Sequence, residues 1–171
     1  WNSDIPRLAA ILESREPPAD PVIRGTAPGE ERDIEIWPGV SMAFVWVPAG
    51  QFMMGSPEKE KQRNEDEGPV HQVSISQGFW MGKYEVTQAE WEAVTGSNPS
   101  RFKGDRRPVE SVSWNDVWAW LEKLNGSFWG EPFRLPTEAE WEYACRAGTS
   151  GPFCTGNCLT AKEANFDGDQ H

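Results

Sequence analysis

Ten tryptophans are the feature that most limits how this chain can fold, because a few large rings carry much of its hydrophobic surface. They occur together with eight phenylalanines in a chain whose apolar fraction is only 37%. Each aromatic side chain buries about 150–250 Å², so a compact core can form without long helices or strands. Sixteen glycines and fourteen prolines predict many turns and irregular segments. At a length of 171 residues, folding buries roughly two thirds of the extended surface.

The charge of the chain limits its partners. Its net charge is −11, whereas binding to a nucleic-acid backbone depends on Lys and Arg side chains that displace counterions. We therefore expect no nucleic-acid partner. No apolar run approaches the roughly eighteen residues that a membrane span requires, so we also expect no membrane span. The chain begins with Trp1 rather than Met, which leaves a removed secretory signal open.

The first 39 residues have the composition of a helix and a linker. Apolar residues recur at helical spacing between Ile5 and Leu12, which predicts a short helix over residues 4–14. The following stretch, EPPADPVIRGTAPGEER, is rich in proline and charge and is typical of a linker. We assign residues 1–39 to this helix and linker, and residues 40–171 to a compact domain. The linker suggests a fused upstream domain, and a flexible tail is the alternative.

Four short strands are predicted before the helical part of the chain. AFVWVPAG and QFMMGS have strand patterns around a glycine turn, and HQVSIS and FWMGKYEV follow as further strands. The segment PEKEKQRNEDEGP carries mixed charges between prolines, and we interpret it as a solvated loop rather than a cation site. We interpret His71 as a surface or packed residue rather than a metal ligand.

Three helices are predicted from hydrophobic periodicity and from start signals. In a capping box, a hydroxyl and a carboxylate three residues apart satisfy orphan backbone donors reciprocally. Such pairs are Thr87 with Glu90 and Thr137 with Glu140, and each cap stabilises its helix by about 1 kcal/mol. The predicted helices are residues 87–95, 113–125 and 137–147.

The middle helix has an apolar face that we expect to pack on the core. The members of this face are Trp114, Val117, Trp118, Leu121 and Leu124.

The string TxAEWE occurs twice, at the start of the first helix and again at the start of the third. One interpretation is a repeated ligand-binding unit. The simpler one is that both helices use the same cap and then bury Trp91 and Trp141 one turn later. Glu140 and Glu142 resemble an acid–base pair, but we attribute the first to capping and expect the second to face solvent.

Three cysteines are too few for a disulfide framework. Cys145, on the third helix, is interpreted as a small core residue. Cys154 and Cys158 flank the loop TGN, and their spacing suits a local disulfide as well as two metal ligands. Their pairing stays open.

Four segments follow one another along the chain: FVWVPAGQFMMGS, EGPVHQVSISQGFWMGKYEVTQAEW, RRPVESVSWNDVWAWLEKLN and FRLPTEAEWEYACRAG. Taken in this order, they resemble the signature segments of formylglycine-generating-enzyme (sulfatase-modifying-factor) domains. The resemblance covers residues 40–171 and corresponds to the amino-terminal half of such a domain, incomplete at its carboxyl end. It implies an α+β, C-type-lectin-like fold with small twisted sheets, about three helices and much irregular chain.

The resemblance also implies a chemistry for the parent protein. Catalytic members use a copper ion held by two cysteine thiolates, together with oxygen, to oxidise a sulfatase cysteine to formylglycine. Soft thiolates suit Cu(I). In the family these cysteines belong to a later GGSW-type segment, which does not occur in this sequence. We therefore predict that the chain is inactive alone and that copper binding requires sequence beyond it.

The segment EANFDGDQH near the carboxyl end is a candidate calcium site. Its oxygen-bearing side chains suit calcium, but the EF-hand pattern is absent, so the residues by themselves favour a polar turn. The family resemblance implies instead that a structural calcium ion is bound by the Asn165 side chain and the Phe166 backbone carbonyl.

Two functions from different classes follow from the resemblance. The first is the front half of a copper-dependent oxidase that matures sulfatases. The second is a non-catalytic C-type-lectin-like module that binds a protein or peptide ligand, such as a variable protein of a diversity-generating retroelement. The family's bacterial branch often lacks the copper cysteines. A third activity, oxidative carbon–sulfur bond formation, requires a multi-histidine iron site, and this chain contains two histidines, His71 and His171.

Overall fold

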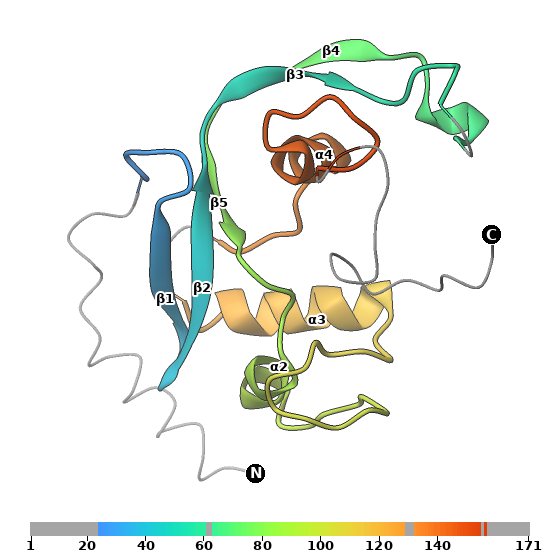
Figure 1. Ribbon diagram of the computed structural model, residues 1–171. Helices are drawn as coiled ribbons and strands as arrows, with labels where there is room; N and C mark the ends of the chain where they lie inside the picture. The colour runs from blue at the N-terminus through green and yellow to red at the C-terminus, as the bar shows by residue number, and fades with distance from the viewer. Residues whose placement is uncertain (1–23, 61–62, 129–131, 155, 157–171) are drawn as a thin grey trace, which may run out of the picture. The chain divides into compact units, whose positions relative to one another are not determined.

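The chain folds into two compact units, each built from two stretches that are far apart in sequence (Figure 1). In the computed structural model, the described residues are 24–60, 63–128, 132–154 and 156. Unit 1 comprises Trp1–Trp46 and Phe79–Leu135, and unit 2 comprises Val47–Gly78 and Pro136–His171. The described part has the predicted α+β character, with two small sheets, three α-helices and long irregular connections.

The sheet of unit 1 has three strands in the order β1-β2-β5 (Figure 1). Strand β1 (Glu31–Trp37) pairs antiparallel with β2 (Val40–Val47), and β5 (Phe79–Gly82) lies on the other side of β2. Strand β1 falls within the stretch that the sequence assigns to a linker. It forms because Ile36, which is 2% exposed, packs in the core while the backbone pairs with β2.

Two helices, α2 (Gln88–Thr95) and α3 (Trp114–Asn125), pack against each other in unit 1. The rings of Trp91 and Trp120 stack between them, with centroids 5.8 Å apart and planes inclined by 5°. The core thereby joins two strands to two helices. Its buried members are Ile36, Met42, Phe44, Trp91, Val94, Trp120, Leu121 and Leu124.

The side of α3 that packs on the core agrees only in part with the predicted face. Leu121 and Leu124 are buried and Val117 packs partly buried against the core, as expected. Trp114 and Trp118 are 64% and 46% exposed, so their predicted burial is wrong. Trp120 is buried in their place. Tryptophans lie on more than one side of this helix, so helical spacing alone fits two different faces. The stack with Trp91 decides between them.

All three helices begin where the sequence predicts. Each N-cap hydroxyl accepts a hydrogen bond from the backbone N–H three residues further on. The capping boxes that begin at Thr87 and Thr137 are confirmed, and Ser113 with Asp116 forms a third one. Because these caps are local interactions, they form without help from distant parts of the chain.

Unit 2 contains a two-stranded sheet and one α-helix. Strand β3 (Gly50–Met54) pairs antiparallel with β4 (His71–Ile75), and α4 (Glu138–Arg146) packs on both strands. The rings of Phe52 and Tyr143 lie 5.3 Å apart. The strands predicted from QFMMGS and HQVSIS are therefore confirmed.

The charged segment of unit 2 is mostly exposed where it is described, as predicted for a solvated loop. It contains a short 3-10 helix, η1 (Glu65–Glu67). The Glu67 carboxylate accepts hydrogen bonds from the Ser56 hydroxyl, at 2.8 Å, and from the Asn64 backbone N–H, at 3.0 Å. These bonds connect the segment to the end of the strand β3.

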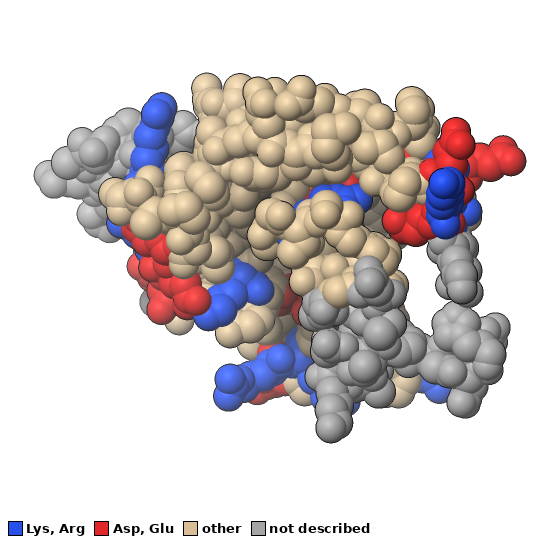
Figure 2. All heavy atoms as spheres, turned by 45° about the horizontal axis from the view of Figure 1, so that its top comes forward, with Lys and Arg blue, Asp and Glu red and all other residues tan. Residues whose placement is uncertain are grey.

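Charged side chains of both signs lie next to one another on the face drawn in Figure 2. In unit 1, the Lys83 ammonium lies 2.6 Å from the Glu31 carboxylate, and Arg32 lies 3.9 Å from Glu30. The acidic excess therefore does not form a single-sign surface on this face. Among the described residues, no helix has both the length and the apolar character to cross a membrane. The helix predicted over residues 4–14 lies outside the described residues.

Candidate functional site

The cysteines that the structure describes do not form a metal site. Cys145 and Cys154 are both free and exposed, so the prediction that Cys145 is a core residue is wrong. Helix α4 turns Tyr143 toward Phe52, which leaves Cys145 on its outer side. Within the described ranges, no group of three His, Cys, Asp or Glu side chains could hold a metal ion. The described residues thus do not fit the two-thiolate copper site of the family, and Cys158 lies outside them.

The predicted calcium ligands, Asn165 and Phe166, also lie outside the described residues. Their role stays a prediction. His71 is exposed, and its Nδ1 lies 2.9 Å from the Pro69 carbonyl oxygen. This position agrees with the interpretation of His71 as a surface residue.

The two TxAEWE strings share a cap but differ in the position of their tryptophan. Trp91 is buried, as predicted, whereas Trp141 is 56% exposed, so its predicted burial is wrong. The Glu140 carboxylate accepts from the Thr137 backbone N–H at 2.8 Å, which confirms its capping role. What the two strings share is therefore the capping box at the start of a helix.

Glu142 does not simply face solvent, as the sequence analysis expects. Its Oε1 accepts from the Gly55 backbone N–H at 2.9 Å and from the Arg146 guanidinium at 2.7 Å. Arg146 in turn donates to the Gly55 carbonyl at 2.9 Å. This pair connects α4 to the end of β3, so Glu142 stabilises unit 2 rather than acting as a catalytic base.

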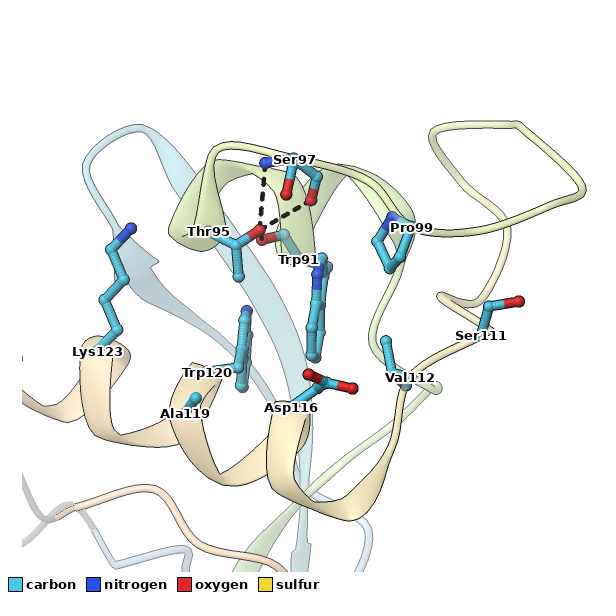
Figure 3. Close-up of a pocket in the computed structure, with 10 residues that line it drawn as sticks. All are labelled: Trp91, Thr95, Ser97, Pro99, Ser111, Val112, Asp116, Ala119, Trp120 and Lys123. Carbon is cyan, nitrogen blue, oxygen red and sulfur yellow. Dashed lines mark hydrogen bonds between the residues drawn. The ribbon is translucent and has the colours of Figure 1, made fainter.

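A groove between α2 and α3 in unit 1 has a lining of both polar and apolar residues (Figure 3). Its volume is about 370 Å³, within the range of about 300–1,000 Å³ that is usual for ligand pockets. One wall is α3, and the other is the end of α2 with the loop that follows it. The lining residues are Trp91, Thr95, Ser97, Pro99, Ser111, Val112, Asp116, Ala119, Trp120 and Lys123.

The floor of the groove contains a hydrogen-bond donor that has no acceptor. Trp120 is 5% exposed, and its indole Nε1–H meets no acceptor among the described residues. A buried donor left unsatisfied costs about 1–3 kcal/mol. In Figure 3 the nitrogen of this ring is on the side of Thr95, away from the α3 backbone. Among the described residues, this donor is the one buried side-chain polar atom without a hydrogen-bond partner.

Opposite charges occupy the two ends of the α3 wall. The Asp116 Oδ2 accepts from the Ser113 hydroxyl at 2.6 Å and from the Ser113 backbone N–H at 2.8 Å. The hydroxyl bond, followed by the backbone bond, holds the pKa of Asp116 below its ordinary value of 3.8, so the group is a carboxylate at neutral pH. Lys123 is exposed and forms no ion pair with a described residue.

The loop that forms the second wall is held by a buried amide. Gln88 is 1% exposed, and its Nε2 donates to the carbonyls of Phe102 and Pro108 at 3.0 and 3.2 Å. Its Oε1 accepts from Asn98 Nδ2 at 2.9 Å and from the Gly104 backbone N–H at 3.0 Å. Since every hydrogen-bonding position of this amide is used, the wall is pre-organised rather than free to adapt.

The same loop ends in a strained residue. Ser111 has a φ of 61°, and the left-handed region costs a residue other than glycine about 1–2 kcal/mol. Such backbone outliers cluster at active sites, ligand-binding sites and switch regions, where the surrounding structure holds them in place. Ser111 lines the groove next to Val112.

Sequence reasoning did not identify this groove. The Asp116 to Lys123 spacing of seven residues, with Trp120 between them, places all three on one side of α3 and could have indicated it. The spacing could not show that α2 and its loop supply the opposite wall.

Residues 39–169 match the family described as "FGE-sulfatase: Sulfatase-modifying factor enzyme 1-like domain". This match covers more than half of the chain. The chain therefore belongs to the family of formylglycine-generating-enzyme-like domains, and the family that the four sequence segments resemble is confirmed.

Three known proteins illustrate the similarity. The formylglycine-generating enzyme of Mus musculus is 28% identical over an alignment of 176 positions, gaps included, that covers 72% of this chain and 45% of that protein. The structure of PvdO from Pseudomonas aeruginosa matches with a TM-score of 0.65 and 32% identity, over 75% of this chain and 55% of that one. Treponema denticola variable protein 1 matches with a TM-score of 0.59 and 26% identity, over 72% and 59%. This chain thus spans about half the length of these relatives. The expected fold class is confirmed.

Proposed function

We propose that this chain is the amino-terminal part of a domain that oxidises a cysteine of a sulfatase peptide to formylglycine. The observation that carries the proposal is the family match over residues 39–169, together with 28% identity to an enzyme of that name over most of the chain. The described residues would supply the scaffold. The copper-binding thiolates would come from sequence beyond this chain, because the described cysteines do not fit the site.

The test uses the full-length protein that carries this chain. It is incubated with a CxPxR peptide, copper and oxygen, and the peptide is followed by mass spectrometry. We expect a product in which the cysteine thiol has become an aldehyde. The same peptide with serine in place of cysteine is the control, and the 171-residue chain alone should leave both peptides unchanged. An unaltered cysteine peptide with the full-length protein rejects the proposal.

A second candidate is a non-catalytic module that binds a protein or peptide ligand. Two observations favour it: the similarity to a variable protein of Treponema denticola, and a groove with a mixed lining in unit 1. A downstream sequence without a cysteine pair would support this candidate, and conversion of the cysteine peptide would reject it.

The first proposal, cysteine oxidation, includes a structural calcium ion bound by the Asn165 side chain and the Phe166 backbone carbonyl. Carboxylate, amide and carbonyl oxygens are the ligands that calcium prefers. Calcium would then stabilise the fold without taking part in the oxidation.

A further inference from the structure

We propose that the groove between α2 and α3 binds a peptide segment of about three residues that carries a cationic group at one end, an apolar residue in the middle and an anionic group at the other end. The inference rests on the described residues of unit 1; it deepens the second candidate function, which uses the same groove, and it does not depend on the cysteine oxidation. Failure of the cysteine oxidation would leave it standing, and its own failure would not affect that reaction.

The length of the ligand follows from the positions of the charges on α3. Asp116 and Lys123 are seven residues apart, and a helix rises 1.5 Å per residue, so the two positions are about 10 Å apart along the axis. An extended peptide spans about 3.3–3.6 Å per residue, which makes three residues a matching length.

The sign of each end follows from the bonding of these two side chains. Both printed bonds to Asp116 go to Oδ2, so Oδ1 is left for a donor from outside the described fold. The Lys123 ammonium has no carboxylate partner among the described residues. A ligand cation at Asp116 and a ligand anion at Lys123 would satisfy both groups.

The middle of the ligand is specified by the floor and the side wall. The Trp91 and Trp120 rings, with Pro99, Val112 and Ala119, offer apolar surface to a side chain of the ligand. The Trp120 Nε1–H still requires an acceptor, and a peptide carbonyl provides one at every residue. Because the nitrogen is covered in the free protein, a small local shift must expose it before a ligand carbonyl can reach it.

The two charges of opposite sign and the apolar middle therefore favour a peptide over a nucleic acid or a fully apolar ligand. A single-sign ligand would satisfy one end of the groove and be repelled at the other. A fully apolar ligand would leave both charges unpaired.

The experiment is an indole N–H titration by NMR with the 15N-labelled 171-residue chain. The ligand is the blocked tripeptide lysyl-phenylalanyl-glutamate, and the all-acidic and all-basic versions are its comparisons. The Trp120 resonance is assigned by its absence in Trp120→Phe. We expect it to move downfield and to saturate with the mixed-charge peptide, and we expect about tenfold weaker binding of both comparison peptides, the change that accompanies loss of one charge-assisted contact.

Charge reversal at Lys123 is a second and more specific test of the proposal. Lys123→Glu should weaken the mixed-charge peptide about tenfold and strengthen the all-basic peptide. Lys59→Glu, an equal change of charge at an exposed residue outside the groove, should change neither. Ala119→Leu should block all binding by filling the groove, while melting temperatures of all three variants stay near that of the unmodified chain.

Three results would overturn the proposal. The first is a Trp120 resonance that does not respond to the mixed-charge peptide. The second is an equal effect of Lys123→Glu and Lys59→Glu. The third is binding that persists in Ala119→Leu.

Discussion

Two glycines of unit 2, Gly55 and Gly148, have a positive φ but differ in the space around them. Gly55 has a φ of 96°, and a Cβ at this position would lie 2.5 Å from the backbone oxygen of Glu67. Its N–H and carbonyl are also held by Glu142 and Arg146. Gly148 has a similar φ of 85°, but no atom lies within 4 Å of the Cβ that it lacks. The two glycines therefore separate backbone strain from steric contact.

Gly148→Ala should lower the free energy of unfolding by about 1–2 kcal/mol, because alanine is strained at a positive φ. Gly55→Ala should cost about 1–3 kcal/mol more, since the added methyl group also meets the Glu67 carbonyl. Urea denaturation of both variants measures the difference. If both variants lose the same free energy of unfolding, the backbone near Glu67 moves away from the added methyl group at little energetic cost.

At the scale of elements, α3 combines a buried and an exposed set of tryptophans on one helix. Trp120 stacks on Trp91 in the core, whereas Trp118 makes an edge contact with Trp114 at a centroid distance of 6.2 Å near the surface. Residues of the same type on the same helix thus have different surroundings. The difference in burial predicts a difference in stability.

Trp120→Ala should lower the free energy of unfolding by about 3–5 kcal/mol, because it leaves a cavity in the core. Trp118→Ala should cost about 1 kcal/mol or less, as expected for an exposed residue with one aromatic contact. Urea denaturation followed by circular dichroism tests both. A loss of more than about 3 kcal/mol for Trp118→Ala would contradict the exposed position of this side chain.

The start of α3 also predicts how stability responds to acid. Hydrogen bonds from Ser113 lower the pKa of Asp116 in the folded state. A lowered carboxyl pKa adds stability that is complete above the ordinary value of 3.8 and is lost as the pH falls through the folded pKa. The carboxyl groups of Glu67 and Glu110 have pKa values shifted in the same direction, mainly by hydrogen bonds from Asn64 and Ser111 respectively.

We therefore expect Asp116→Asn to be less stable than the unmodified chain at pH 7, and the difference to shrink as the pH is lowered below about 4. Ser113→Ala should weaken the same pH dependence, because it removes the hydroxyl that contributes most to the shift. Urea denaturation of the unmodified chain and both variants at pH values from 7 to 3 would measure how the free energy of unfolding depends on pH. A stability difference that does not vary with pH would contradict this account.

At the scale of the whole molecule, the chain belongs to the family of formylglycine-generating-enzyme-like domains, and its described residues form two small sheets, three helices and the groove. The acidic excess of the chain suits a cation, and the calcium prediction at Asn165 and Phe166 can be tested without knowing the reaction. A ligand that binds only the folded state raises stability by about 2.7 kcal/mol when its concentration is a hundred times its Kd.

Calcium should accordingly raise the melting temperature of the full-length protein that carries this chain, and a chelator should reverse the increase. Magnesium should have a smaller effect, since it demands a more rigid coordination geometry. Asn165→Ala should remove the response to calcium and leave the calcium-free melting temperature nearly unchanged. A variant that still responds fully would exclude Asn165 as a ligand.

The helix starts at Thr87, Ser113 and Thr137 could be predicted from the sequence because each depends on groups within three residues of one another. The family could also be predicted from the sequence, because its motifs are short stretches that occur in a fixed order along the chain. The predicted strands also follow from local alternation. These features were determined by the sequence itself.

Tertiary structure alone decided which of the repeated residue types became buried. Trp120 rather than Trp118 entered the core because it met Trp91, and Glu142 became a structural group because it met Gly55, 87 residues away. The groove has the same origin, for its walls come from α2, its following loop and α3. Contacts between distant residues are set by packing of the whole unit, and helical spacing carries no information about them.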